Sequence, residues 1–179
     1  MVCVLFLSMC IPCEAAQTST ATASDANATT GFPQITSTSA IIMDAQSGQI
    51  IYEKNSHTRQ YPASITKIMT AYLAIKNGDL NSTITMSDAA VWGIDRNSSH
   101  IALDVGEEIS MSDALYAVML MSANEAAWAI AEQVSGSLEN FVQLMNDTAQ
   151  SLGCKDTHFT NANGLHDPDH YTTAYDMAL

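Results

Sequence analysis

The chain has 179 residues, of which 47% are hydrophobic, which is enough for one ordinary core but not for two large domains. Its 6 Lys and Arg residues stand against 19 Asp and Glu residues, so the formal net charge is -13. A chain this acidic lacks the cations that would neutralise a phosphate backbone or adhere to an anionic membrane. We therefore expect one main domain that does not bind nucleic acid.

The first 16 residues are typical of a secretory signal peptide. Val2 to Ile11 form an apolar run too short to span a bilayer, and small residues surround a cleavage point after Ala15 or Ala16. No Lys or Arg precedes this run, so a buried first strand or helix stays open as an alternative, as does a lipoprotein site at Cys10. Residues 17–38 are rich in Thr, Ser and Ala and predict a flexible leader of an exported protein.

Cysteine and histidine spacing argues against a metal site. Three of the four cysteines fall inside the predicted signal, so only Cys154 would remain after cleavage, as a small buried apolar residue. His166 and His170 are four residues apart, but Pro168 between them disfavours a helical metal-binding face. We expect a turn there, and no metal or other cofactor.

Ordered structure is expected from Ser39. Two β-prone runs, 40–44 and 49–54, flank a turn and predict a hairpin. A loop through Pro62 then leads to a helix that ends at Asn77-Gly78. Apolar residues recur along this helix every three or four positions, at Ile65, Ile68, Met69, Tyr72 and Leu73. Such a stripe predicts that this face is buried.

The middle of the chain is predicted to be helical. The elements expected there are a short strand at 83–86, a loop at 92–104, and helices from Ser110 to about Ser122, at 123–134 and at 138–152. Ser110 and Asp113 form a capping-box pattern, and Gly136 and Gly153 close the last two helices.

Ser64 and Lys67 lie three residues apart where the loop gives way to the first helix. This spacing places both side chains on one helix face. A serine hydroxyl is a poor nucleophile at neutral pH, and an amine in a partly dry site can act as its base. The unpaired N–H groups of a helix N-terminus also favour negative charge on the serine oxygen. The pair predicts an acylatable serine with its own base.

Ser122-Ala123-Asn124 falls in the break between two predicted helices. From such a corner, Ser122 could relay a proton between Lys67 and a leaving amine, while the Asn124 amide could bind Lys67 or a substrate peptide group. The alternative is that Ser122 and Asn124 only cap helix ends.

Ser-x-x-Lys followed by Ser-x-Asn resembles the signature of penicillin-binding proteins and serine β-lactamases. The stretches 40–54, 62–73, 115–127 and 158–165 further resemble the low-molecular-mass D-alanyl-D-alanine carboxypeptidases of peptidase family S11. The resemblance implies an α/β (α+β) fold of the β-lactamase/transpeptidase type, with an N-terminal hairpin of an antiparallel sheet and a helical subdomain. Residues 39–179 would be its catalytic domain.

The resemblance also implies roles for the residues. Ser64 would be the acyl-accepting nucleophile and Lys67 its base, with Ser122 in the proton network and Asn124 binding substrate. The substrate would be the terminal D-Ala-D-Ala of a peptidoglycan stem peptide at the cell envelope, and β-lactams would trap the same serine.

One family feature is absent. The third motif, Lys-Thr-Gly or Lys-Ser-Gly, does not occur before Leu179, so the resemblance implies a catalytic domain truncated before its C-terminal strands. We expect these 179 residues alone to be poorly stable and close to inactive, because the missing strand carries part of the oxyanion hole. A membrane anchor beyond Leu179 stays open.

Two alternatives stay open at this point. A serine β-lactamase is the nearer one, but the second motif is Ser-Ala-Asn rather than Ser-Asp-Asn and no Glu-x-x-Leu-Asn segment is present. The other is a non-catalytic penicillin-recognising or cell-wall-binding module, which covalent labelling of Ser64 would rule out.

Overall fold

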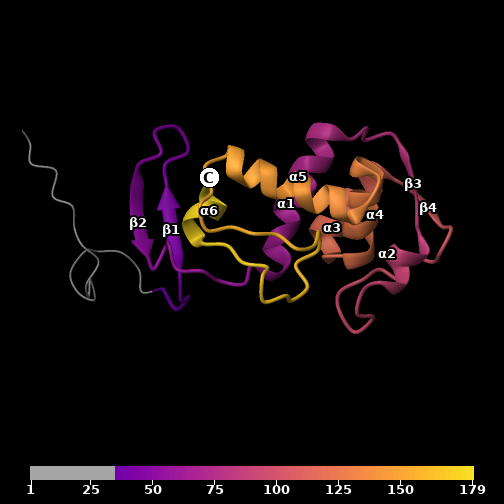
Figure 1. Ribbon diagram of the computed structural model, residues 1–179, viewed down its shortest axis with the longest axis horizontal. Coiled ribbons are helices and arrows are strands. Elements are labelled where there is room, and N and C mark those ends of the chain that lie inside the picture. The colour runs from indigo at the N-terminus through magenta and orange to yellow at the C-terminus, as the bar shows by residue number, and fades with distance from the viewer. Residues whose placement is uncertain (1–34) are drawn as a thin grey trace, which may run out of the picture. The chain divides into compact units, whose positions relative to one another are not determined.

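The computed structural model describes residues 35–179. The predicted signal and most of the predicted leader lie outside these residues. The elements, in chain order, are β1 (Ala40–Met43), β2 (Ile50–Lys54), the 3₁₀ helix η1 (Ala63–Thr66), α1 (Lys67–Asn77), β3 (Thr83–Thr85), α2 (Asp88–Trp92), β4 (Glu108–Ser110), α3 (Met111–Met121), α4 (Asn124–Ser135), α5 (Leu138–Ser151) and α6 (Ala174–Ala178). The two ribbons, β1–β2 and β3–β4, lie at opposite ends of the helices (Figure 1).

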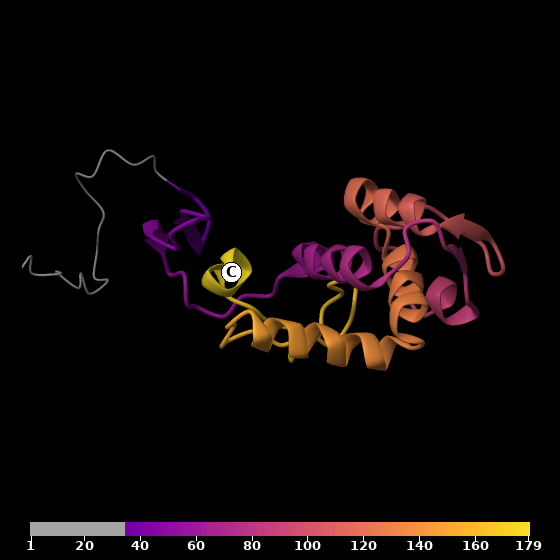
Figure 2. The same ribbon diagram turned by 90° about the horizontal axis from the view of Figure 1, so that it is seen from above.

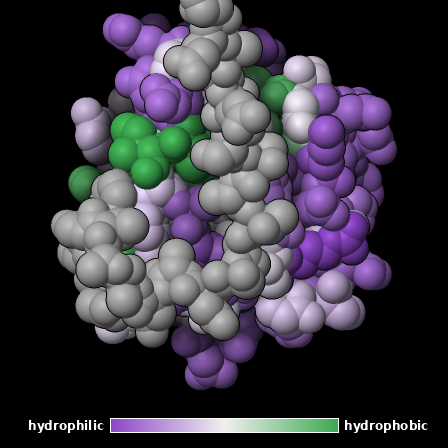
Figure 3. Space-filling model, turned by 90° about the vertical axis from the view of Figure 1, so that its left-hand side faces the viewer, coloured by the Kyte–Doolittle hydropathy of each residue, from purple (hydrophilic) through white to green (hydrophobic). Residues whose placement is uncertain are grey.

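The first ribbon is the hairpin that the sequence predicts. β1 and β2 pair antiparallel, with a register shift between Ile42 and Met43. Asp44 organises the turn, because its carboxylate accepts hydrogen bonds from the N–H and the hydroxyl of Ser47. The hairpin exposes large apolar side chains, Ile42, Ile50 and Ile51. Figure 3, which faces this end of the molecule, shows strongly hydrophobic residues at the surface.

Helix α4 lies at the centre of the helical part and contacts α1, α2, α3 and α5 (Figures 1 and 2). Its buried faces are built mainly from alanine, at Ala126, Ala127, Ala129 and Ala131, together with Ile130. Small side chains let neighbouring helices approach closely on several sides, and burial of their apolar surface stabilises the core.

Most predicted elements are confirmed. The hairpin, the strand near Thr83 and helices α3, α4 and α5 lie where the sequence places them. Ser110 caps α3 as predicted: its hydroxyl accepts from the Asp113 N–H and donates to the Asp113 carboxylate. Gly136 ends α4 with a φ of 78°, which an L side chain rarely adopts. Strand β4 and the short helix α2 lie outside the predicted elements.

The predicted buried face of α1 is wrong. Ile65, Ile68 and Tyr72 are exposed, and Leu73 is the buried member of the predicted stripe together with half-buried Met69. The inward face instead carries polar groups whose hydrogen bonds are satisfied inside the protein. The residues of α1 buried there are Lys67, Thr70, Ala71, Leu73 and Ala74.

None of the helices found in residues 35–179 is both long and apolar enough to cross a bilayer.

Candidate active site

Ser64 lies in the short 3₁₀ helix η1, one turn ahead of α1, and its side chain is exposed. The preceding residue, Ala63, has a φ of 48° in the left-handed region, which is strained for a residue other than glycine. In a 3₁₀ turn, residues three apart lie directly above one another. Lys67 Nζ accordingly lies 3.3 Å from Ser64 Oγ. The serine is therefore open to solvent, while the amine that contacts its hydroxyl is buried.

Lys67 is 3% exposed, although it carries a charged group. Its Nζ donates to Asn124 Oδ1 at 2.7 Å and to the backbone carbonyl of Asn163 at 2.6 Å. Burial lowers the pKa of Lys67, the nearby charge of Glu125 raises it, and the balance is about 8. Lys67 can therefore exchange a proton near neutral pH.

Ser122 occupies the break between α3 and α4. Its backbone is left-handed, with φ 56° and ψ 32°, and this turns the chain sharply at the end of α3. The Ser122 hydroxyl donates to Ser64 Oγ at 2.9 Å. Ser64 Oγ thus contacts a hydroxyl and an amine, both within hydrogen-bond reach.

Asn124 opens α4 and is held from both sides. Its Nδ2 donates to Ser98 Oγ at 2.8 Å and its backbone N–H to the Ser99 carbonyl at 3.0 Å. With Nδ2 donating, Oδ1 is the atom that faces Lys67. All four residues singled out from the sequence, Ser64, Lys67, Ser122 and Asn124, therefore meet in one place.

The loop before α6 supplies contacts that the sequence prediction missed. Besides the Asn163 carbonyl, the Ala162 carbonyl accepts from the buried Thr70 hydroxyl at 2.6 Å. Gly164 has a φ of 83°, and a Cβ there would lie 1.9 Å from the Ala63 carbonyl oxygen. The Asn-Gly pair in this stretch is a turn signal visible in the sequence. What the sequence does not reveal is that the turn packs against Ala63, the residue before the serine.

His170 was also missed as a neighbour of the site. Its ring is buried and lies 2.7 Å from the Thr66 hydroxyl through Nε2, while Nδ1 accepts the Thr160 N–H at 3.0 Å. Since Nδ1 accepts, Nε2 carries the proton and donates to Thr66. Burial lowers the pKa of His170 to about 4, against a raising influence of Asp167. The histidine is therefore neutral and locks the residue between Ser64 and Lys67.

The remaining sequence candidates have other neighbours. His166 packs edge-on against Tyr61, with ring centroids 4.7 Å apart. Cys154 is half-buried rather than buried, and burial raises the pKa of its thiol. Its Sγ donates to the Asp176 carbonyl at 3.5 Å. Across residues 35–179, no group of three or more His, Cys, Asp or Glu side chains is placed to hold a metal ion.

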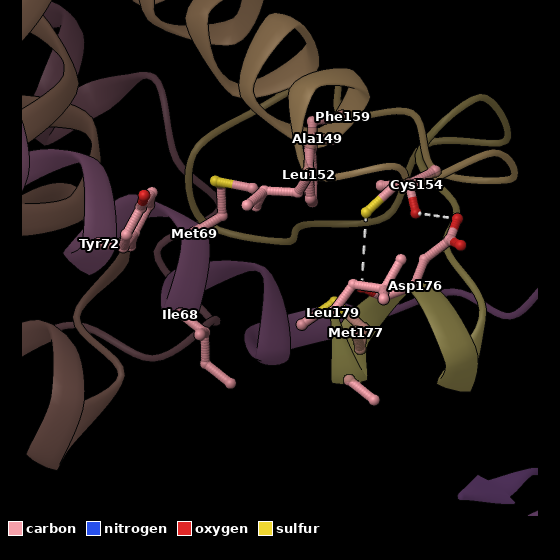
Figure 4. A pocket seen from close by; sticks show the side chains of 12 residues that line it. Ile68, Met69, Tyr72, Ala149, Leu152, Cys154, Phe159, Asp176, Met177 and Leu179 are labelled. Carbon is pink, nitrogen blue, oxygen red and sulfur yellow. Dashed lines mark hydrogen bonds between the residues drawn. The ribbon is translucent and has the colours of Figure 1, made fainter. Parts of the chain in front are cut away.

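A pocket of about 320 Å³ (Figure 4) is lined by none of the four candidate residues Ser64, Lys67, Ser122 and Asn124. Ile68, Met69 and Tyr72 of α1 line one side of it, and Met177 and Leu179 line another. The exposed side chains of Ile68 and Tyr72, from the stripe predicted to be buried, therefore border this pocket.

Comparison with known proteins gives the family. The model of the D-alanyl-D-alanine carboxypeptidase family, peptidase S11, matches residues 24–179. The chain is 43% identical over 155 residues to the D-alanyl-D-alanine carboxypeptidase DacA of Haemophilus influenzae, covering 82% of this chain and 39% of that protein. It is 41% identical to DacF of Bacillus subtilis, covering 79% of this chain and 37% of that protein. The chain thus spans about two fifths of the length of these relatives.

Comparison with solved structures gives the same family. The fold matches penicillin binding protein 5 from Haemophilus influenzae with a TM-score of 0.78 and 39% identity, over 84% of this chain and 45% of that one. It matches a Streptomyces K15 DD-transpeptidase with a TM-score of 0.76 and 29% identity, over 82% of this chain and 60% of that one. The mixed helix and sheet fold is therefore of the penicillin-binding, transpeptidase type. By fold, by sequence and by the matched residues, the chain belongs to the D-alanyl-D-alanine carboxypeptidase family, peptidase S11.

Proposed function

We propose that this chain carries the nucleophile of a serine D-Ala-D-Ala carboxypeptidase. Ser64, Lys67, Ser122 and Asn124 are the residues to which we assign the chemistry. The observation that carries the proposal is the contact of Ser64 Oγ with both Lys67 Nζ, at 3.3 Å, and Ser122 Oγ, at 2.9 Å.

The hydrogen bonds of Lys67 direct its lone pair. A protonated amine has three N–H donors, and the three oxygens around Nζ belong to Asn124, Asn163 and Ser64. The two carbonyl contacts are short, so a neutral amine would keep its two N–H groups on those carbonyls. Its lone pair would then face Ser64 Oγ, as a general base requires.

The reaction follows from this geometry. Ser64 Oγ attacks the carbonyl carbon of the penultimate D-Ala and forms a C–O bond, while its proton passes to Lys67 Nζ. The C–N bond to the last D-Ala breaks, and the leaving amine takes a proton from Lys67 through the Ser122 hydroxyl. Water then hydrolyses the ester, which restores Ser64 and releases the shortened stem peptide.

Binding and location belong to the same proposal. In this proposal the Asn124 amide binds the substrate peptide group, and β-lactams inhibit the enzyme by acylating Ser64. Residues 1–16 would direct export, residues 17–38 would be a leader, and the protein would act at the cell envelope on peptidoglycan. The carbonyls of Ile35 and Ser37 accept hydrogen bonds from Lys54, so the last leader residues contact the end of β2.

Labelling with a fluorescent penicillin tests the proposal. The full-length gene product should become covalently labelled and should release D-Ala from a D-Ala-D-Ala peptide, and Ser64→Ala should do neither. The exposed Ser37→Ala is a matched control that should label like the wild type. Undiminished labelling of Ser64→Ala would refute the nucleophile assignment, and no labelling of the wild type would favour a non-catalytic module.

A further inference from the structure

Glu125 is a fully buried carboxylate next to the candidate site. It lies in the first turn of α4, directly after Asn124, and is 0% exposed. Its Oε1 accepts the Ile101 N–H at 2.7 Å. Its Oε2 is buried and makes no hydrogen bond with any part of residues 35–179. A buried carboxylate with one unbonded oxygen is costly, so a compensating positive charge is expected nearby.

Lys67 is the positively charged group that we consider the partner of Glu125. The atoms that accept hydrogen bonds from its Nζ are neutral: Ser64 Oγ, Asn124 Oδ1 and the Asn163 carbonyl. His170, which reaches the neighbouring Thr66, is neutral as well. Glu125 is the charged group that acts on Lys67, and its influence raises the pKa of Lys67 against burial. The charge of Glu125 therefore offsets part of the cost of burying the charge of Lys67, across the start of α4.

The other oxygen of Glu125 serves the wall of the site. The segment 98–101 is joined to the first two residues of α4 by three hydrogen bonds. Two involve Asn124, with Ser98 Oγ and the Ser99 carbonyl, and the third is that of Glu125 Oε1 with the Ile101 N–H. One carboxylate thus bonds the segment that orients Asn124 and acts through its charge on the amine that Asn124 binds.

We propose that Glu125 is a positioning residue for acyl transfer, whose buried charge is the counter-charge of Lys67 and whose Oε1 anchors segment 98–101. Its part in acyl transfer rests on the proposed function above. Its electrostatic link to Lys67 does not, and it can be measured without catalysis.

The first measurement is the protonation midpoint of Lys67 in the intact protein, by NMR of lysine labelled with ¹³C at Cε. The chain has four lysines, Lys54, Lys67, Lys76 and Lys155. The signal missing from Lys67→Arg identifies Lys67. In Glu125→Gln, which keeps a side-chain oxygen for Ile101 but loses the charge, the midpoint should fall by about 1 pH unit. An unchanged midpoint would overturn the proposal.

Two variants separate charge from structure. Glu132→Gln is the matched control on the same helix, because its carboxylate bonds Ser87 and Trp128 and should leave the Lys67 midpoint unchanged. Glu125→Asp keeps the charge but is too short for the same bond to Ile101. A counter-charge predicts a lowered midpoint in Glu125→Gln and a midpoint near the wild type in Glu125→Asp. A merely structural role, through the Ile101 bond that Glu125→Gln keeps and Glu125→Asp loses, predicts the reverse.

The failure of each proposal is distinguishable. If wild-type protein is not labelled by penicillin but its Lys67 midpoint responds to Glu125→Gln, the proposed function fails while the counter-charge stands. If wild-type protein is labelled and the midpoint does not respond, the role of Glu125 fails alone.

Discussion

In the proposed mechanism, the proton on Lys67 Nζ controls whether Ser64 has a base, because the neutral form alone offers a lone pair to the hydroxyl. With a pKa of about 8, about a tenth of the Lys67 side chains are neutral at pH 7. An exposed lysine, with a pKa near 10.4, would be neutral in well under one part in a thousand. Burial of this single side chain therefore raises the fraction of Lys67 in the neutral form at pH 7 more than a hundredfold.

The rate of penicillin acylation should follow this titration. Because Lys67 must lose its proton, the rate should rise with pH and level off above a midpoint of about 8. Lys67→Arg keeps a positive charge that does not titrate, and it should lower the rate by at least about 100-fold at every pH. Stopped-flow or quenched labelling between pH 6 and pH 10 measures both effects. A pH-independent rate in the wild type would contradict the assignment of Lys67 as the base.

At the scale of elements, the turn with Ser64 and the loop before α6 act as one unit. Gly164 lies so close to Ala63 that a side chain cannot fit between them. The same loop carries the Asn163 and Ala162 carbonyls that bind α1. The position of Ser64 therefore depends on a segment about 100 residues further along the chain.

Gly164→Ala should disrupt this unit. Its Cβ would lie 1.9 Å from the Ala63 carbonyl oxygen at a φ of 83°, so we expect a loss of about 2 to 4 kcal/mol of stability together with slower acylation of Ser64. Gly106→Ala is the matched control, because Gly106 has a φ of 80° but nothing within 4 Å. It should cost about 1 kcal/mol and leave acylation unchanged. Urea unfolding and penicillin labelling test both variants, and equal losses in the two would contradict the close-contact argument.

The elements also show what a sequence can predict. Caps and turns are local, so Ser110, Gly136 and the hairpin were predicted correctly. The buried face of α1 was not, because Thr70 and Lys67 point inward to oxygens of residues 162–163 and 124. Periodicity counts apolar residues and cannot detect polar groups that find distant partners. The same reason kept Glu125 and His170 out of the predicted site.

At the scale of the whole molecule, His170 couples folding to pH. Its pKa is about 4 in the folded chain and about 6.5 when unfolded, so the unfolded state binds more protons between these values. Stability contributed by the neutral ring is present above pH 6.5 and is lost as the pH falls towards 4. The full effect is at most about 3 kcal/mol.

His170→Gln should remove this dependence. The variant should be less stable than the wild type at pH 7, because the bond between Thr66 and the buried ring is altered, and the difference should shrink towards pH 4.5. Urea unfolding at pH 7, 5.5 and 4.5 gives the comparison, and comparing the two proteins cancels the titration of the shared carboxylates. A difference that stays constant with pH would show that His170 is not the titrating group.

The partners of Lys67 come from far along the chain, 57 residues away for Asn124 and 96 for Asn163. Closing loops of this length costs chain entropy, so these hydrogen bonds form only once the distant segments have come together. Before then, Lys67 is hydrated and protonated, and Ser64 is an ordinary alcohol. If Ser64 is the nucleophile proposed above, it is chemically silent in a nascent or misfolded chain and becomes reactive only when the distant segments arrive. Covalent capture by a penicillin would then be a direct report of native assembly.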